Sequence, residues 1–425
     1  MIPRYTIYIF NILFSIFFIG RAQLSEYEVL TNITDKADSI ITTGIKNRAF
    51  PGAQILVAVK GNVLLHKTYG FHTYDSLLPV QKTDFYDLAS VTKILGPLPL
   101  LMKLVDEKRL DLDAPFSKYW PSWRNQKDKK GITLREILSH QAGLTPYIVF
   151  LNEVLDKEGL KHRFIREIPD RRFQNQAYKD IWVRNTFENR IFRRIKRSEV
   201  SEKKEYLYSG LAFLIFPKLI EDLTGNSYTY MLKKEFLFPL NIPSLGYLPE
   251  KKGFPNPIIP TEFDSLYRKT LVQGWVHDEN ASLFGGISGN AGLFGTARDL
   301  YRFMQMYQNY GVLDGRRYLS EETVKEFTRV QYPGNNNRRG LGFDKPLLDN
   351  AQKDITEAYP APSASAESFG HSGFTGTFVW ADPKYQLVFI FLSNRVYPSR
   401  DHRQLYELNI RTSLHQLFYE YLEQH

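Results

Sequence analysis

Two segments with the pattern of β-hairpins, one near each end of the chain, constrain the fold more than any other feature of this 425-residue sequence. In both, strand-like apolar residues lie on either side of a turn-forming pair, as in neighbouring antiparallel strands. The segments are residues 54–70 (QILVAVKGNVLLHKTYG), with a turn at Gly61-Asn62, and residues 375–394 (TGTFVWADPKYQLVFIFLSN), with a turn at Asp382-Pro383.

Helical periodicity lies on the outer side of each hairpin, over residues 28–48 and 403–423. The middle of the chain, from about residue 90 to 330, is mostly helical in pattern and rich in loops. This order predicts an α/β (α+β) fold. An antiparallel sheet is built from both termini and flanked by helices, and a large helical subdomain is inserted into it.

The first 22 residues have the pattern of a secretory signal peptide. A short positive segment ends at Arg4, an apolar run covers residues 5–20, and Gly20 and Ala22 occupy the −3 and −1 positions of a cleavage site. We therefore expect cleavage after Ala22 and one domain over residues 23–425. The mature protein is expected to be exported across the cytoplasmic membrane to the periplasm. An uncleaved membrane anchor is the alternative, although sixteen residues are short for a bilayer span.

The net charge of +9 is concentrated in two places. Residues 1–22 carry two cations and no acid, and residues 157–204 carry fifteen Lys or Arg against seven Asp or Glu. The rest of the chain is close to neutral, and no helix-turn-helix, RNA-recognition or zinc-finger pattern is present, so nucleic acid is not an expected partner. With 43% hydrophobic residues the chain is not disordered, and without cysteine it has neither disulfides nor thiol chemistry.

The first motif that could carry chemistry is Ser90-Val91-Thr92-Lys93. In a helix that begins near Ser90, Lys93 lies one turn later on the same face. A serine becomes a nucleophile when a base takes its proton, and a partly desolvated lysine can be that base. Alone, this spacing is a weak signal, because a capping serine and a solvated lysine give the same pattern.

Two further motifs follow along the chain. Tyr208-Ser209-Gly210 precedes an apolar helix, and a phenol beside a lysine can relay a proton. The segment 370–377 (GHSGFTGT) leads into the C-terminal hairpin, and its glycines allow the backbone to approach a ligand closely. Either motif alone is as well explained by ordinary structure.

Together, in this order, the three motifs resemble those of the penicillin-binding protein and class C β-lactamase superfamily. The resemblance covers about residues 25–424. It includes PGAQ at 51–54, DLASVTK at 87–93, LREILSHQAGL at 134–144, LTGNSY at 223–228, HDENA at 277–281 and GNAGLFGTARDL at 289–300. The HQAGL, VHDENA and GHSGFTGT segments look most like a bacterial branch found beside, or fused to, cell-wall glycosidases, some of whose members are muramyl-peptide amidases.

The resemblance implies acyl transfer by a serine hydrolase with a β-lactamase/transpeptidase-like fold. Ser90 attacks a carbonyl, Lys93 accepts its proton, and Tyr208 with Lys93 passes the proton to the leaving group. The N–H groups of Ser90 and Phe374 form the oxyanion hole, and His371, Ser372 and Gly373 line the substrate strand. No metal or cofactor is implied.

Three departures from the family pattern stand out. The third motif begins with His371 in place of lysine, which removes a fixed cation, since histidine is largely neutral at pH 7 on its usual pKa. The second motif ends in Gly210, where relatives carry Asn or Asp. Both changes argue against an efficient β-lactamase. Pro97 and Pro99 fall inside the expected nucleophile helix and should kink it after its first turn.

The remaining candidates are histidines and one basic segment. His140 and His277 lack metal-ligand spacing, and we expect His140 to bond backbone near the site. His277, Asp278 and Glu279 either touch substrate on a rim loop or brace that loop. The basic helical insert at 145–205 contains a predicted helix at 181–200, which is either a solvated surface or a surface that attracts anionic cell-wall material.

The sequence therefore predicts an exported SxxK serine hydrolase that acts on an amide in peptidoglycan or muropeptides. The resemblance also implies a cell-wall glycosidase as a working partner. A β-lactamase, a D-Ala carboxypeptidase or an esterase would use the same residues. A catalytically dead cell-wall binding or regulatory module is the alternative of a different class. The sequence leaves the oligomeric state open.

Overall fold

A computed structural model describes residues 29–424. The predicted signal peptide, residues 1–22, lies outside the described residues. Between residues 29 and 424, none of the helices combines the length and the apolar character needed to cross a membrane.

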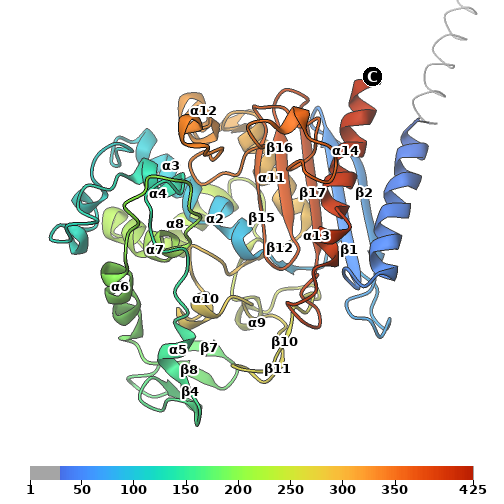
Figure 1. Cartoon of the computed structure of the whole chain (residues 1–425). Coiled ribbons are helices and arrows are strands. Elements are labelled where there is room, and N and C mark those ends of the chain that lie inside the picture. Colours follow the sequence, from blue (N-terminus) through green and yellow to red (C-terminus); the bar gives the residue numbers. More distant parts are fainter. Residues whose placement is uncertain (1–28, 425) are drawn as a thin grey trace, which may run out of the picture.

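One five-stranded antiparallel sheet joins the two ends of the chain (Figure 1). Both predicted hairpins are present, and they meet where β1 pairs with β17, so that Ala53 lies opposite Ser393. The predicted sheet built from both termini is thus confirmed. In spatial order the strands are β15 (Phe369–Ser372), β16 (Phe378–Asp382), β17 (Leu387–Ser393), β1 (Gly52–Val59) and β2 (Asn62–Gly70).

The turn of the first hairpin differs by one residue from the prediction. Asn62 already belongs to β2 and pairs with Val59, so the turn residues are Lys60 and Gly61. Both have positive φ, 50° and 79°, as a two-residue hairpin turn of the favoured hand requires. The second turn is longer and covers residues 383–386 between β16 and β17.

Alternate residues of the sheet face two different layers. Ile55 and Val57 of β1 pack with the N-terminal helix (residues 29–46) and with α14 (Ile410–Glu423), which lie on one face in Figure 1. Leu56 and Ala58 face the opposite way, into the larger core, where α11 (Ala297–Gln308) packs on the sheet. Because both faces are covered, β1 is buried along almost its whole length.

The C-terminal helical segment is divided in two. A single helix over 403–423 was predicted, but α13 (Gln404–Glu407) ends and α14 begins after Asn409, whose φ is 49°. A left-handed residue cannot continue an α-helix, so the chain changes direction there.

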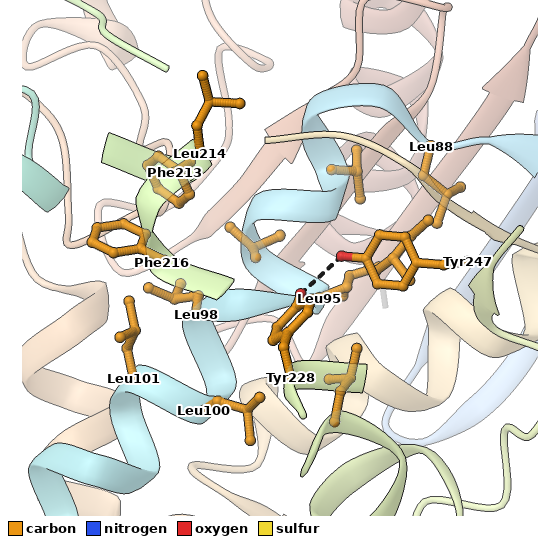
Figure 2. Packing of buried hydrophobic residues seen from close by; sticks show 14 of the residues in the cluster. Leu88, Leu95, Leu98, Leu100, Leu101, Phe213, Leu214, Phe216, Tyr228 and Tyr247 are labelled. Carbon is orange, nitrogen blue, oxygen red and sulfur yellow. Dashed lines mark hydrogen bonds between the residues drawn. The ribbon is translucent and has the colours of Figure 1, made fainter. Parts of the chain in front are cut away.

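The larger core surrounds the first motif. A 3₁₀ turn, η1 (Ala89–Val91), leads into α2 (Thr92–Leu95) and then α3 (Pro97–Asp106), whose leucines pack against α7 (Leu211–Thr224), as Figure 2 shows. In the same view Tyr228 and Tyr247 share a hydrogen bond of 2.8 Å beside Leu95. The nucleophile segment is therefore held by a close-packed apolar core.

Short elements complete this region. A three-stranded sheet has the order β3-β12-β9. The elements are β3 (Tyr86–Asp87), β12 (Leu293–Gly295), β9 (Gly246–Tyr247), β10 (Phe263–Asp264), β11 (Thr270–Leu271), β13 (Val312–Leu313), β14 (Arg316–Arg317), α4 (Leu134–Leu138), α8 (Tyr228–Leu232), α9 (Pro249–Lys252), α10 (Glu279–Leu283) and α12 (Glu321–Thr328), with short 3₁₀ or π segments at Phe116–Lys118, Pro121–Trp123, Lys233–Leu237, Pro333–Asn335 and Asn350–Gln352.

The predicted kink after Lys93 is a complete break. α2 ends at Leu95, and Pro97 becomes the first residue of α3, a position where its missing N–H is not needed. The backbone between them, Gly96, is crowded, because a Cβ there would lie 2.6 Å from the Tyr228 hydroxyl. The hydroxyl of Tyr307 donates to the Ile94 carbonyl at 2.8 Å and satisfies a group near the break.

The insert at 145–205 is less helical than predicted. It contains α5 (Leu151–Val154), a two-stranded sheet of β4 (Leu155–Asp156) and β5 (Gly159–Leu160), a three-stranded sheet of β6 (Ile165–Arg166), β8 (Ile181–Val183) and β7 (Asn175–Tyr178), and the helix α6 (Phe187–Arg197).

Helix α6 has the faces that its sequence predicts. Phe187, Ile191 and Ile195 are buried, and the arginines lie on the other side. Two of the arginines, Arg190 and Arg194, pair with Glu153. The predicted helical start at residue 181 is wrong, because β8 occupies residues 181–183.

Candidate active site

Ser90 lies in the 3₁₀ turn η1, three residues after the end of β3. The Asp87 carboxylate accepts a hydrogen bond from the Ala89 N–H at 2.8 Å and another from the His277 N–H at 2.6 Å. Ala89 has a φ of 44°, which is uncommon for a residue other than glycine. The chain therefore turns sharply just before Ser90, and Ser90 borders an open cavity.

Lys93 lies one turn beyond Ser90 and is buried. Its Nζ donates to Ser90 Oγ at 2.8 Å and to the carbonyl of Asn290 at 3.1 Å. The rings of Tyr208 and Phe213 lie 5.6 and 5.5 Å from the same Nζ. The first motif thus has the geometry that its spacing predicts.

Tyr208 approaches this pair from the loop before α7. Three hydrogen bonds hold that loop: Leu207 N–H to the His140 carbonyl, Ser209 Oγ to the Thr145 carbonyl and Gly210 N–H to the Pro146 carbonyl. Burial by itself raises the pKa of Tyr208, but the charges of Lys93 and Arg339, together with the interactions of its hydroxyl with Ser90 and Lys93, outweigh it. The pKa of this phenol consequently lies below its usual value.

His140 contacts the Tyr208 ring and the backbone that carries it. Its Nδ1 accepts a hydrogen bond from the Ser209 N–H at 3.2 Å, and its ring centroid lies 4.4 Å from that of Tyr208. The prediction that His140 bonds backbone near the site is confirmed. Burial, followed by the charges of Arg339 and Lys93, holds its pKa well below the usual value, so the ring is neutral.

The third motif lies against the nucleophile turn. Gly373 has no room for a side chain, because a Cβ would lie 2.6 Å from the Leu88 carbonyl oxygen and 3.3 Å from Ala89 Cβ. Within the described residues, the N–H groups of Ser90 and Phe374 have no hydrogen-bond acceptor. Both residues line the same cavity, so these two N–H groups are available to an oxygen of a ligand.

His371 is buried at the start of this motif, and Ser372 follows it on β15. The pKa of His371 is lowered to about 3, first by burial and then by the charges of Arg339 and Lys93. Its Nδ1 faces the Ser372 carbonyl oxygen at 2.8 Å, so the neutral ring carries its proton on Nδ1. The position supplies no cation.

A cavity of about 300 Å³ opens beside Ser90. Polar or charged side chains and apolar side chains both line it. The lining residues are Ala89, Ser90, Tyr147, His277, Asp278, Glu279, Ala291, Phe374 and Arg400.

The predicted rim residues both brace their loop and line this cavity. His277 Nε2 lies 2.7 Å from Glu262 Oε2. Asp278 caps α10 through the Ala281 N–H at 2.8 Å and accepts from Asn290 Nδ2 at 3.1 Å. Glu279 pairs with Arg400 at 2.7 Å. The two alternatives left open by the sequence are therefore compatible.

Several residues at the site were not among the predicted site residues, although Asn290 lies in the 289–300 segment that carries the family resemblance. Asn290 offers a backbone carbonyl to Lys93, and Arg339 lies behind Tyr208 and His371. Tyr147 and Arg400 line the cavity from loops that are distant in the sequence. Only their position in three dimensions identifies them. In the part of the chain that the structure describes, no group of His, Asp and Glu side chains is arranged to hold a metal ion.

The chain is similar to known proteins over most of its length. Residues 37–412 match the family model described as Beta-lactamase. The N-acetylmuramyl-L-alanine amidase of Bacillus subtilis is 27% identical over 385 residues, which cover 85% of this chain and 80% of the amidase. A provisionally assigned D-alanyl-D-alanine carboxypeptidase of Salmonella typhimurium is 27% identical over 372 residues, covering 81% of this chain and 79% of its own.

Solved structures share the fold. A penicillin-binding protein homologue from Caulobacter crescentus superposes with a TM-score of 0.62 at 18% identity, covering 92% of this chain and 97% of its own. EstCE1, described as a hydrolase with promiscuous acyltransferase activity, superposes with a TM-score of 0.64 at 16% identity, covering 90% and 98%.

Proposed function

The chain belongs to the β-lactamase family of hydrolases, and from that premise we propose that it is an exported serine hydrolase that cleaves an amide bond in peptidoglycan or its fragments. The observation that carries the proposal is the 2.8 Å contact between Lys93 Nζ and Ser90 Oγ at the edge of the cavity. A solvated lysine beside a capping serine would not be 2% exposed, as Lys93 is.

The proposed reaction is acyl transfer in two halves. Ser90 Oγ forms a bond to the substrate carbonyl carbon, and its proton passes to the Lys93–Tyr208 pair. The negative charge on the carbonyl oxygen is stabilised by the N–H groups of Ser90 and Phe374, each worth roughly 10²–10³ in rate. The C–N bond then breaks, and the leaving nitrogen takes the proton from the pair.

Water completes the cycle at the same carbon. It gives a proton to the Lys93–Tyr208 pair while its oxygen bonds to the acyl carbon. When the second intermediate collapses, the bond to Ser90 Oγ breaks, and the serine recovers its proton. The products are a carboxylic acid and an amine, and every residue returns to its starting state.

The choice of an amide in cell-wall material rests on the relatives. One is named as an N-acetylmuramyl-L-alanine amidase and another as a D-alanyl-D-alanine carboxypeptidase. The neutral His371 weakens the case for a substrate that needs a cation for its carboxylate at that position. The exposed arginines of α6, such as Arg193 and Arg197, would attract the anionic wall polymers on which a partner glycosidase also acts.

Three enzymes with the same residues remain second candidates: an esterase, a β-lactamase and a carboxypeptidase. A binding module without activity is the candidate of a different class. The reason to consider it is Gly210, which stands where relatives carry Asn or Asp. A Cβ at Gly210 would meet no atom within 4 Å, so the space that a longer side chain would occupy is open.

Covalent labelling with a fluorophosphonate tests the proposal. The wild-type protein is expected to be labelled at Ser90, and Ser90→Ala is expected to lose labelling by a factor on the order of 10⁴ or more. Ser265→Ala is the matched control, because Ser265 is exposed and lies outside the cavity. Absence of label on folded wild-type protein would support the binding module instead.

Digestion of purified muropeptides then identifies the bond. Release of free peptide together with free sugar is expected for the amidase, and loss of a single alanine would identify a carboxypeptidase. Hydrolysis of a chromogenic ester or cephalosporin in place of muropeptides would identify the esterase or the β-lactamase.

Export has its own test. The mass of the protein secreted by its host is expected to correspond to a chain that begins at Gln23. A membrane-bound chain that retains residues 1–22 would instead establish the uncleaved anchor.

A further inference from the structure

A buried arginine lies behind the proposed catalytic residues. Arg339 is 2% exposed, and its Nη1 pairs with Asp344 Oδ1 at 3.0 Å. Its guanidinium carbon lies 5.5 Å from the ring centroid of Tyr208. Arg339 is not among the residues that line the cavity.

Two histidines face the same guanidinium. Arg339 Nη2 lies 3.4 Å from His371 Nε2 and 3.4 Å from His140 Nε2. Because His371 carries its proton on Nδ1, its Nε2 is free to accept from Arg339. A second proton on His371 would face the positive charge of Arg339. The arginine therefore favours the neutral form of His371.

Hydrogen bonds connect the loop that carries Arg339 to residues 139–141 and to β15. Asn337 Nδ2 donates to the Ser139 carbonyl and to Gln141 Oε1, on either side of His140, while Asn337 Oδ1 accepts from the Arg339 N–H. Asp344 exchanges two backbone hydrogen bonds with Gly370, next to His371. The guanidinium is thereby fixed between the second and third motifs.

The charges around Tyr208 do not cancel. Arg338 and Arg339 share the carboxylate of Asp344, but of these three groups it is Arg339 that lies against Tyr208, 5.5 Å from its ring centroid, and whose charge acts on the phenol. Lys93 adds a second cation, with its Nζ 5.6 Å from the ring centroid. The other titratable groups that face Tyr208 are Tyr206, His140 and His371, and the two histidines are neutral. An excess of positive charge in a buried site favours the anionic form of the phenol.

We propose that Arg339 is the fixed cation of this active site and a positioning residue, which acts through Tyr208 by favouring transfer of the phenol proton and by keeping His371 in its neutral, Nδ1-protonated form. The proposal rests on the proposed serine hydrolase activity. The lowered pKa of Tyr208, to which the charge of Arg339 contributes after that of Lys93, supports it.

The pH dependence of Ser90 labelling tests this role. In Arg339→Met the rate of fluorophosphonate labelling is expected to fall at least about tenfold at pH 7, and its rising limb to move at least about one pH unit upward, since a base without a cation ionises later. Arg339→Lys, which keeps the charge, is expected to retain most of the rate and the position of the limb.

Arg338→Met is the matched control, because Arg338 shares Asp344 but does not contact Tyr208. It is expected to leave the pH profile unchanged. If Arg339→Met folds poorly, the double variant Arg339→Met/Asp344→Asn removes both charges of the buried pair and is measured instead. The same upward displacement is expected.

Two results would overturn the inference. One is a pH profile of Arg339→Met, or of the double variant, that coincides with the wild type. The other is a uniform loss of rate at every pH that Arg339→Lys does not restore, which marks a purely structural role. Failure of the wild type to label at Ser90 is a separate result and refutes the hydrolase proposal itself.

Discussion

Gly373 has no room for a side chain beside the nucleophile turn. A Cβ on this residue would lie 2.1 Å from Thr377 Oγ1 and 2.6 Å from the Leu88 carbonyl oxygen, so the strand would have to move. Because Phe374 follows directly, its N–H group would move with it.

Substitution Gly373→Ala is therefore expected to reduce Ser90 labelling by roughly 10²–10³, the value of one oxyanion donor. The strain should also lower the free energy of unfolding by about 1–3 kcal/mol. Gly131→Ala, where a Cβ meets no atom within 4 Å, serves as the control. Equal labelling rates for the two variants would show that the Phe374 N–H is not used.

The sequence predicted the residues that carry their own local signal. Ser90 and Lys93 are three positions apart, so one helical turn brings them together whatever the rest of the chain does. Arg339 and Asn290 come from loops whose positions depend on the packing of the whole core. A single sequence contains no pattern that places such loops beside Tyr208.

At the scale of elements, the break between α2 and α3 separates the catalytic turn from the helix that follows it. The Ile94 carbonyl at this break accepts the hydroxyl of Tyr307, which is buried on α11. The proline at residue 97 consequently ends one helix and begins the next without leaving this carbonyl unpaired.

Tyr307→Phe removes that donor and leaves the Ile94 carbonyl buried without it. We expect the free energy of unfolding, measured with urea, to fall by about 1–3 kcal/mol. Tyr310→Phe removes a hydroxyl from a partly exposed tyrosine just after the same helix and should change stability little. A similar loss in both variants would contradict the role assigned to the Tyr307 hydroxyl.

The helix predicted to begin at residue 181 was wrong because a short strand, β8, lies there. In β8 the side chains of Ile181 and Val183 are buried and Trp182 lies between them, which is strand alternation. Phe187, Ile191 and Ile195 recur every four residues as in a helix, but Ile181 lies six residues before Phe187 and is off that face, so the helix was begun too early. The hairpins were recognised because their apolar runs are longer and each has a turn.

At the scale of the whole molecule, buried neutral histidines make the folded state sensitive to acid. His415 on α14 stacks on Phe389 with ring centroids 4.5 Å apart, and its pKa is lowered by burial to about 3. The unfolded chain binds a proton there near pH 6.5, whereas the folded protein does not until about pH 3. The contribution of His415 is therefore complete above pH 6.5 and is lost as the pH falls toward 3.

His415→Phe keeps an aromatic ring in this position and removes the titration. The free energy of unfolding of the wild type is expected to decline more steeply than that of the variant between about pH 6 and pH 4, by up to about 1.4 kcal/mol per pH unit. His162→Gln, a change at an exposed histidine, should not alter the slope. Parallel curves for wild type and His415→Phe would contradict the assignment.

The sheet also determines the order in which the protein can fold. Ala53 pairs with Ser393, which leaves the ribosome 340 residues later. Contacts so distant in sequence form slowly, and here the first hairpin has no partner until synthesis is nearly finished. For the export proposed above, this delay keeps the nascent chain open, so a translocation channel would receive it before the sheet can close.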